Sequence, residues 1–309
     1  MIEGRMNAIE RFVELQTKSL ALHHVNATSR FIDLAKPKMR AHVLEAGAGA
    51  PLVLLHGGDG EAVNWAPMMA PLQEHARIFA VDRPGFGLSD AFDYRGVNLR
   101  AHAADFVVSV LDALKLEMAT LVGSSMGGFF ALAATLAHQH RVRALVLVGY
   151  AVGAVRELPL AIRIICGVPG LSRRFMKARP TMEAQRKQYR EMFHVDLTKV
   201  PELYFETRIA GLQLPSEQGT WAELLPRVAN LWGIRPEVYL GDELSRIEVP
   251  SLMIMGERDM APADAGRAVM AKIPGGRFEF LPGVAHFPYF EAPERTAELI
   301  GAFLRREAT

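Results

Sequence analysis

The sequence predicts an α/β fold in which helices cover both faces of a mostly parallel sheet and a helical cap is inserted over one edge. Two patterns carry this prediction. Strand and helix patterns alternate over residues 30–150 and again over 247–309, and the expected strands are continuous apolar runs, as in parallel strands that are buried on both faces. From 151 to 246 the strand patterns disappear and prolines separate short helical stretches, so we expect the cap, or lid, there.

The first part of the chain predicts one helix and then four strands. Residues 1–5, MIEGR, resemble a protease-recognition sequence left over from expression, and we exclude them from the fold prediction. Within 6–29, Ile9, Phe12 and Leu20 fall near helical spacing, and we expect this N-terminal helix to pack on the core rather than on a second copy or the lid. Runs rich in β-formers then predict strands at 30–34, 40–45, 51–56 and 78–81.

The rest of the chain continues the alternation. The stretch 99–116 places Phe106, Val110 and Leu114 on one face of a helix. Beyond it we expect a strand at 119–123, a helix at 126–138 and a buried strand at 144–150. After the insertion, the sequence predicts a strand at 251–255, a helix at 263–272, a strand at 277–281 and a closing helix at 293–306.

Composition and charge exclude several classes of protein. The 309 residues carry 35 basic and 34 acidic side chains, so the net charge of +1 offers no general field for nucleic acid or an anionic membrane. No apolar run is long enough to span a bilayer, and the N-terminus lacks the apolar stretch of a secretory signal, so we expect a cytoplasmic protein. The single cysteine, Cys166, excludes an internal disulfide and a cysteine-rich metal site.

The stretch GSSMG, residues 123–127, follows an expected strand and opens an expected helix. The pattern G-x-S-x-G in this setting predicts a nucleophile elbow, a tight bend that holds a serine out above the strand ends. Gly123 and Gly127 suit the bend because side chains two residues either side of the nucleophile would clash. Ser125 at the centre is the predicted nucleophile, whereas Ser124 is a flanking residue.

The glycine-rich stretch HGGDG, residues 56–60, ends an earlier strand. Its backbone N–H groups can approach an oxyanion, and we expect the N–H groups of Gly58 and Met126 to form an oxyanion hole. His56 is a candidate base by residue type, but we expect it to anchor this loop by hydrogen bonds instead.

An acid and a histidine complete the predicted site. Asp259, in GERDM just past a late strand, is expected to orient a histidine; Glu257 competes with it but lies closer to the strand end. His286 lies in the loop after the last strand and is the expected general base and acid. The order Ser125, Asp259, His286 is the order typical of G-x-S-x-G hydrolases.

The stretches HGGDG, DRPGFGLSD, GSSMGG, GERD and GVAHFPYFEAPE together resemble the α/β-hydrolase fold family over residues 30–309. This resemblance implies an eight-stranded, mostly parallel sheet with the cap between the sixth and seventh strands. It also implies the triad roles for Ser125, Asp259 and His286, with neither metal nor organic cofactor. Relatives that act as epoxide hydrolases or haloalkane dehalogenases carry Asp where this chain has Ser125. Secreted lipases of this family have secretory signals and disulfides, and the sequence predicts neither for this chain.

The expected activity is acyl transfer on a small-molecule ester or ketone, and the first candidate is a carboxylesterase on small or medium acyl esters. The second is a carbon–carbon bond hydrolase of the meta-cleavage-product type, which usually carries Asn and Trp where this chain has Ser124 and Phe287. A perhydrolase-like side activity ranks third, and a ligand receptor with slow turnover is the alternative from another class. Arg190, in the basic half of the lid, is a candidate ligand for a substrate carboxylate. The sequence leaves a homo-oligomer open.

Overall fold

A computed structural model describes residues 7–58, 60–177, 180–217 and 219–306, and it confirms the eight-stranded sheet. The strands lie in the order β1-β2-β4-β3-β5-β6-β9-β10, and only the pairs β1–β2 and β2–β4 are antiparallel. The sheet is therefore mostly parallel, as predicted. The strands are β1 (Ala27–Leu34), β2 (Met39–Ala46), β3 (Ala50–Leu55), β4 (Ala76–Val81), β5 (Ala119–Ser125), β6 (Val142–Ala151), β9 (Ser251–Gly256) and β10 (Arg277–Leu281).

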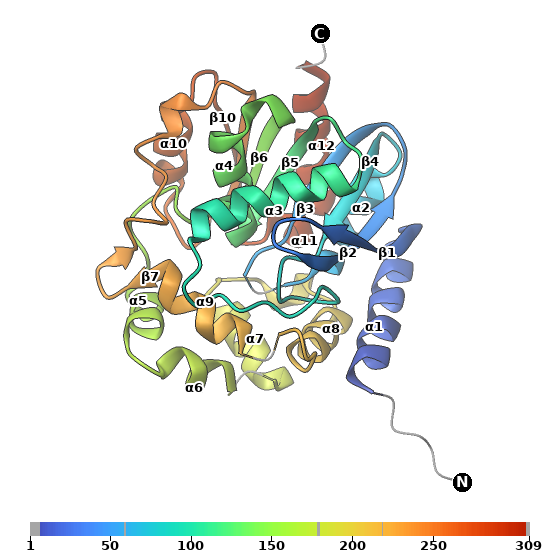
Figure 1. Ribbon diagram of the computed structural model, residues 1–309, viewed down its shortest axis with the longest axis vertical. Helices are drawn as coiled ribbons and strands as arrows, with labels where there is room; N and C mark the ends of the chain where they lie inside the picture. The colour runs from blue at the N-terminus through green and yellow to red at the C-terminus, as the bar shows by residue number, and fades with distance from the viewer. Residues whose placement is uncertain (1–6, 59, 178–179, 218, 307–309) are drawn as a thin grey trace.

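Helices cover both faces of the sheet because successive strand residues point to opposite sides. In β5, for example, Leu121 joins the core beneath α3, α4 and α10, whereas Val122 joins the core on the opposite face, beneath α2 and α12. Figure 1 shows α3 crossing one face of the sheet. These helices are α2 (Ala66–Leu72), α3 (Leu99–Ala113), α4 (Met126–Ala137), α10 (Ala263–Lys272) and α12 (Pro293–Arg306), with the short α11 (Pro288–Glu291) before the last.

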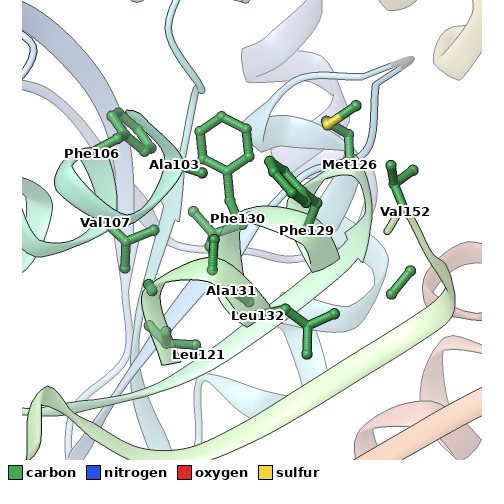
Figure 2. Packing of buried hydrophobic residues seen from close by; sticks show 14 of the residues in the cluster. Ala103, Phe106, Val107, Leu121, Met126, Phe129, Phe130, Ala131, Leu132 and Val152 are labelled. Carbon is green, nitrogen blue, oxygen red and sulfur yellow. The ribbon is translucent and has the colours of Figure 1, made fainter. Parts of the chain in front are cut away.

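Aromatic packing fixes α4, the helix that follows the predicted elbow. Phe106 of α3 and Phe130 of α4 meet edge to face with ring centroids 5.7 Å apart, and Phe129 meets Phe130 in the same way (Figure 2). All three rings are buried. The start of α4 is thus held against α3, which makes it a rigid base for the bend before it.

The chain between β6 and β9 is mainly helical, and it also contains a hairpin that the sequence did not predict. Its two strands have only two residues each, which is too short for a period of two to appear. Figure 1 shows the inserted helices gathered at one end of the sheet. The elements are α5 (Leu160–Gly167), α6 (Leu171–Lys177), α7 (Met182–Glu191), α8 (Glu202–Leu212), α9 (Thr220–Val228), β7 (Ala229–Asn230) and β8 (Gly233–Ile234), and the short 3₁₀ turns of the chain are Ala62–Trp65, Gln139–Arg141, Leu197–Lys199 and Leu244–Arg246.

The N-terminal helix α1 (Ala8–Leu22) packs against α8 of the insertion, and it also packs on the core, since Phe12, Leu15 and Leu20 belong to the core cluster beneath α2 and α12. Phe12 and Leu15 are buried, and the hydroxyl groups of Ser19 and Thr207 lie 3.3 Å apart across this contact. The helix ends before β1 begins at Ala27, so the boundary of the N-terminal segment lies a few residues before the expected position 29. Residues 1–5 lie outside the described residues. In the described ranges, no helix combines the length and the apolar character needed to cross a bilayer.

A buried charge cluster joins the insertion to the core. The Arg208 guanidinium on α8 donates to Glu61, which follows the HGGDG stretch, and to Glu217 at 2.9 Å. All three side chains are buried. Two carboxylates face one guanidinium, and burial together with repulsion from Glu217 raises the pKa of Glu61 well above its usual value.

The raised pKa of Glu61 predicts a pH-dependent effect of Glu61→Gln. Because the folded-state pKa of Glu61 is raised, its contribution to stability is complete below the unfolded pKa of about 4.3 and falls as the pH rises through the folded pKa. Glutamine cannot ionise and keeps an acceptor for Arg208. Urea unfolding at pH 5.5 and pH 8 should therefore show the free energy of unfolding of the variant, relative to wild type, rising with pH. An unchanged difference, as expected for the exposed control Glu298→Gln, would contradict a raised pKa of Glu61.

Candidate active site

Ser125 stands at the junction of β5 and α4 with φ +52° and ψ −113°, a backbone conformation that L-residues rarely adopt. The packing around the bend explains why glycines flank the serine: side chains there would clash. A methyl group on Gly123 would lie 2.5 Å from the carbonyl oxygen of Gly127, and one on Gly127 would overlap the carbonyl group of Leu55 in β3. The bend therefore requires glycine on both sides, as the elbow pattern predicts.

The two adjacent serines differ in exposure. Ser124 is fully buried and pairs with Val148 in the register of β5 and β6. Ser125 is part-exposed and lines a cavity of about 100 Å³. Of the two hydroxyl groups, only that of Ser125 faces a space that a substrate can enter.

The carboxylate of Asp259, three residues beyond β9, accepts three hydrogen bonds. One comes from Nδ1 of His286 at 2.6 Å, one from the backbone N–H of Tyr150 at 2.8 Å and one from the backbone N–H of Met260 at 2.6 Å. The Asp259 and His286 side chains are buried. The structure thus brings together the two residues that the sequence paired. Since Nδ1 of His286 faces Asp259, Nε2 is the ring nitrogen left for the cavity, which His286 also lines.

The end of β6 is shaped to admit this pair. Gly149 has φ +75°, and a methyl group there would lie 2.5 Å from the carbonyl oxygen of His286. The irregular pairing of β5 with β6 near Ser125 accompanies this turn, which points the N–H of Tyr150 at Asp259. Glu257, the competing acid, lies instead on the exposed side, where it accepts the N–H of Gly283 at 2.8 Å.

Glu291 holds the histidine loop, and the sequence analysis gave it no role. Its Oε2 accepts the N–H groups of Ala285 at 3.1 Å and Phe287 at 3.2 Å, the residues on either side of His286. Burial raises the pKa of Glu291, and these two hydrogen bonds oppose the shift. The ring of Phe193 stacks on the imidazole of His286 at 5.4 Å between centroids. Glu291 is the fifth residue after His286 and belongs to the stretch GVAHFPYFEAPE. The sequence does not show what Glu291 contacts, because its partners become clear only in the folded loop.

His56 anchors the HGG stretch by hydrogen bonds, as expected. Nδ1 of His56 lies 2.8 Å from the Gly57 carbonyl, and Nε2 accepts the N–H of Arg83 at 2.9 Å. Burial, with the nearby Arg83 charge, lowers the pKa of His56 to about 3. The buried Arg83 guanidinium also donates to the carbonyl groups of His56 and Gly57. His56 is therefore occupied by backbone partners and is not available as a base.

This anchoring brings the glycines of the stretch to the cavity. A methyl group on Gly57 would lie 3.4 Å from Cβ of Ser125, so the loop faces the serine directly. Gly58 and Met126 both line the cavity, and the ring of Trp221 packs so closely on Gly58 that any side chain at 58 would overlap it. Trp221 belongs to α9, and nothing in its local sequence indicated this contact. Asp59 of HGGDG lies outside the described residues.

The cavity wall is mainly apolar and comes largely from the insertion. None of its described lining residues is a Lys, Arg, Asp or Glu, and its polar side chains beyond Ser125 and His286 are few. Burial raises the pKa of the Cys166 thiol, which faces the cavity, to about 12. The apolar wall is built from Val152, Leu158, Ile162, Ile165, Phe175, Met192, Phe193, Trp221, Leu225, Val228, Ala229, Ile234, Met260 and Phe287.

Arg190 does not join this cavity. Its side chain is exposed at the end of α7 and pairs with the neighbouring Glu191 at 3.4 Å. The expectation that Arg190 binds a substrate carboxylate therefore finds no support in the geometry. Helical periodicity explains the difference, because Gln188 and Met192 of the same stretch take the positions that face the cavity.

The contacts of Glu291 predict a loss of activity without a loss of binding. Glu291→Ala removes the acceptor on both sides of His286, so the imidazole should be misplaced and kcat for a 4-nitrophenyl ester should fall about 10–100-fold with little change in KM. Glu291→Gln keeps an oxygen acceptor and should stay near wild type. Equal kcat values for the alanine and glutamine variants would contradict a positioning role for the carboxylate.

Comparisons with known proteins show which proteins this chain is similar to. Two curated relatives carry the name 2-hydroxy-6-oxononadienedioate/2-hydroxy-6-oxononatrienedioate hydrolase. The protein from Paraburkholderia phymatum is 30% identical over 293 residues, covering 91% of this chain and 97% of its own length. The protein from Burkholderia vietnamiensis is 30% identical over 296 residues, covering 92% and 98%.

Solved structures show the same fold. A carboxylesterase from Bacillus subtilis has a TM-score of 0.75 at 23% identity, covering 96% of this chain and 98% of its own. A meta-cleavage product hydrolase from Pseudomonas fluorescens has a TM-score of 0.73 at 22% identity, covering 90% and 97%. The family model of the alpha/beta hydrolase fold matches residues 50–293, a range that includes the HGG stretch, the serine bend and the histidine loop. This chain belongs to the α/β hydrolase fold family, and it is an enzyme of the hydrolase class.

Proposed function

We propose that this hydrolase is a serine carboxylesterase that uses Ser125, His286 and Asp259 as a catalytic triad. One observation carries the proposal: Ser125, at the tip of a strained bend, lines the same cavity as His286, whose Nδ1 is hydrogen-bonded to the buried carboxylate of Asp259. A nucleophile, a base and an orienting acid are the groups that acyl transfer needs. Residues 151–246 act as the cap that encloses the substrate.

The first half of the reaction forms an acyl-enzyme. Nε2 of His286 takes the proton of Ser125 as the serine oxygen bonds to the carbonyl carbon of the ester. Asp259 stabilises the resulting imidazolium through the 2.6 Å hydrogen bond at Nδ1. When the tetrahedral intermediate collapses, the bond to the leaving alcohol breaks, and the alcohol departs with the proton from His286.

Water completes the cycle. His286 takes a proton from water, the hydroxide bonds to the acyl carbon, and the ester bond to Ser125 breaks as the serine recovers its proton. The backbone N–H groups of Gly58 and Met126 are the proposed donors to the negative oxygen in both tetrahedral intermediates. Their support is the closeness of the HGG stretch to Ser125 and the position of Met126 at the first turn of α4. A donor of this kind typically contributes about 10²–10³ in rate.

The cavity wall favours an uncharged, apolar acyl group. A carboxylate on the substrate would lose its hydration without a cationic partner, since no described lining residue is Lys or Arg. Arg208, the fully buried arginine of α8, is paired with two glutamates. These observations support esters of apolar acids as the first candidate substrates.

A second candidate is hydrolysis of a carbon–carbon bond. Its support is the name of the relatives at 30% identity, whose substrates are dicarboxylates. The same triad can serve this reaction, but a dicarboxylate fits the apolar wall poorly. A receptor with slow turnover, the alternative from another class, has no need for the buried Asp259–His286 pair. A cytoplasmic location and a homo-oligomer stay expectations from the sequence.

A substrate panel tests this assignment. Wild type, Ser125→Ala and the exposed control Ser245→Ala would be assayed on 4-nitrophenyl butyrate, on an anionic 4-nitrophenyl hemisuccinate and on 2-hydroxy-6-oxononadienedioate. We expect the highest kcat/KM on the butyrate, a loss of at least about 10³-fold in Ser125→Ala and no loss in the control. Higher kcat/KM on the dienedioate than on the butyrate would establish the carbon–carbon hydrolase instead.

A further inference from the structure

Helix α5 is apolar on two sides, and only one of them is buried. Ile162, Ile165 and Cys166 line the cavity. Leu160 and Ile164 project from the other side with 64% and 39% of their surface exposed, and Val168, just after the helix, is 39% exposed. These three residues are spaced by four, so they form one stripe along the helix. An apolar side of a helix is normally buried, and this second side of α5 is not.

The β7–β8 hairpin extends this stripe. Trp232 at its tip is 84% exposed, the largest fraction among the exposed large apolar side chains in the described ranges, and Leu231 is 39% exposed. The hairpin is fixed to α5, because the Arg163 guanidinium donates to the carbonyl of Leu231 at 2.6 Å and Gly167 packs directly on Leu231. Five neighbouring apolar side chains thus form one surface, which we call the α5 patch: Leu160, Ile164, Val168, Leu231 and Trp232.

Basic side chains lie on the helix that carries the patch and on the helix that packs against it. From Leu158 to Met182 the chain contains no Asp or Glu. Arg173, Arg174 and Lys177 are exposed on α6, which packs against α5. Arg163 lies within α5 itself. The patch therefore has basic side chains beside its apolar centre, on a protein whose total charge is only +1, and Glu157 is the exposed acid nearest to it in the sequence.

We propose that the α5 patch binds the surface of an anionic lipid bilayer. Tryptophan at a tip, aliphatic side chains beside it and Arg or Lys around them are the groups that adsorb to the boundary between acyl chains and negative headgroups. A second copy of the chain fits less well, because five side chains are far fewer than the roughly 20–30 residues that each partner contributes to a stable interface. Because the inner side of α5 lines the cavity, such binding brings the cavity close to apolar compounds dissolved in the bilayer.

Vesicle binding tests the proposal without using catalysis. Full-length protein would be floated with vesicles of phosphatidylcholine and phosphatidylglycerol at 3:1 and with pure phosphatidylcholine vesicles. The variants are Trp232→Ser and Leu160→Ser, with Phe31→Ser and Ile9→Ser as controls that remove exposed apolar side chains elsewhere. The two patch residues do not line the cavity, so hydrolysis of soluble 4-nitrophenyl butyrate should be unchanged in both variants.

We expect wild type and both controls to bind the anionic vesicles, and each patch variant to bind about tenfold more weakly. Binding to anionic vesicles should weaken in 0.5 M NaCl, because salt screens the charges. Binding should persist in Ser125→Ala, so a failure of vesicle binding can be told apart from a failure of the proposed catalysis. Three results would overturn it: no binding of wild type to anionic vesicles, equal binding by the patch variants, or a wild-type dimer that Trp232→Ser converts to monomer without any vesicle binding.

Discussion

The carboxylate of Asp259 is the point on which the rest of the site depends. Through three hydrogen bonds it joins the loop after β9, the end of β6 at Tyr150 and the histidine loop at His286. Because these segments lie far apart in the sequence, their meeting requires the parallel order β6-β9-β10, which brings the carboxyl ends of the strands to one edge. The close approach of the turn at Gly149 to the backbone of His286 is part of the same constraint.

The bend at Ser125 adds a second constraint of the same kind. The strained backbone of Ser125 persists because β3 and the start of α4 pack against the bend without room for side chains at Gly123 or Gly127. The close packing at the centre of the sheet thus stabilises the strained backbone conformation of Ser125. Around this rigid edge the insertion adds an apolar wall, and the buried Glu61–Arg208–Glu217 cluster ties that wall to the loop that carries the glycines of the HGG stretch.

The parts of this arrangement that the sequence predicted are those with a local physical cause. The glycines around Ser125, and the placement of Asp259 and His286 just beyond strand ends, follow from bond geometry and topology, and so do most strands and helices of the sheet. Long-range packing decided the rest. The contact of Trp221 with Gly58 and the role of Glu291 depend on elements brought together only by folding, and Arg190 failed to reach the cavity because its helix turns it outward.

The central claim is that His286 and Asp259 activate Ser125, and covalent labelling tests it most directly. The protein would be treated with diisopropyl fluorophosphate, and the modified residue identified by peptide mass spectrometry in wild type and in His286→Ala. The account predicts a single adduct on Ser125 that forms at least about 10³-fold more slowly without the imidazole. An adduct on Ser124, or labelling of Ser125 that is as fast in His286→Ala as in wild type, would contradict it.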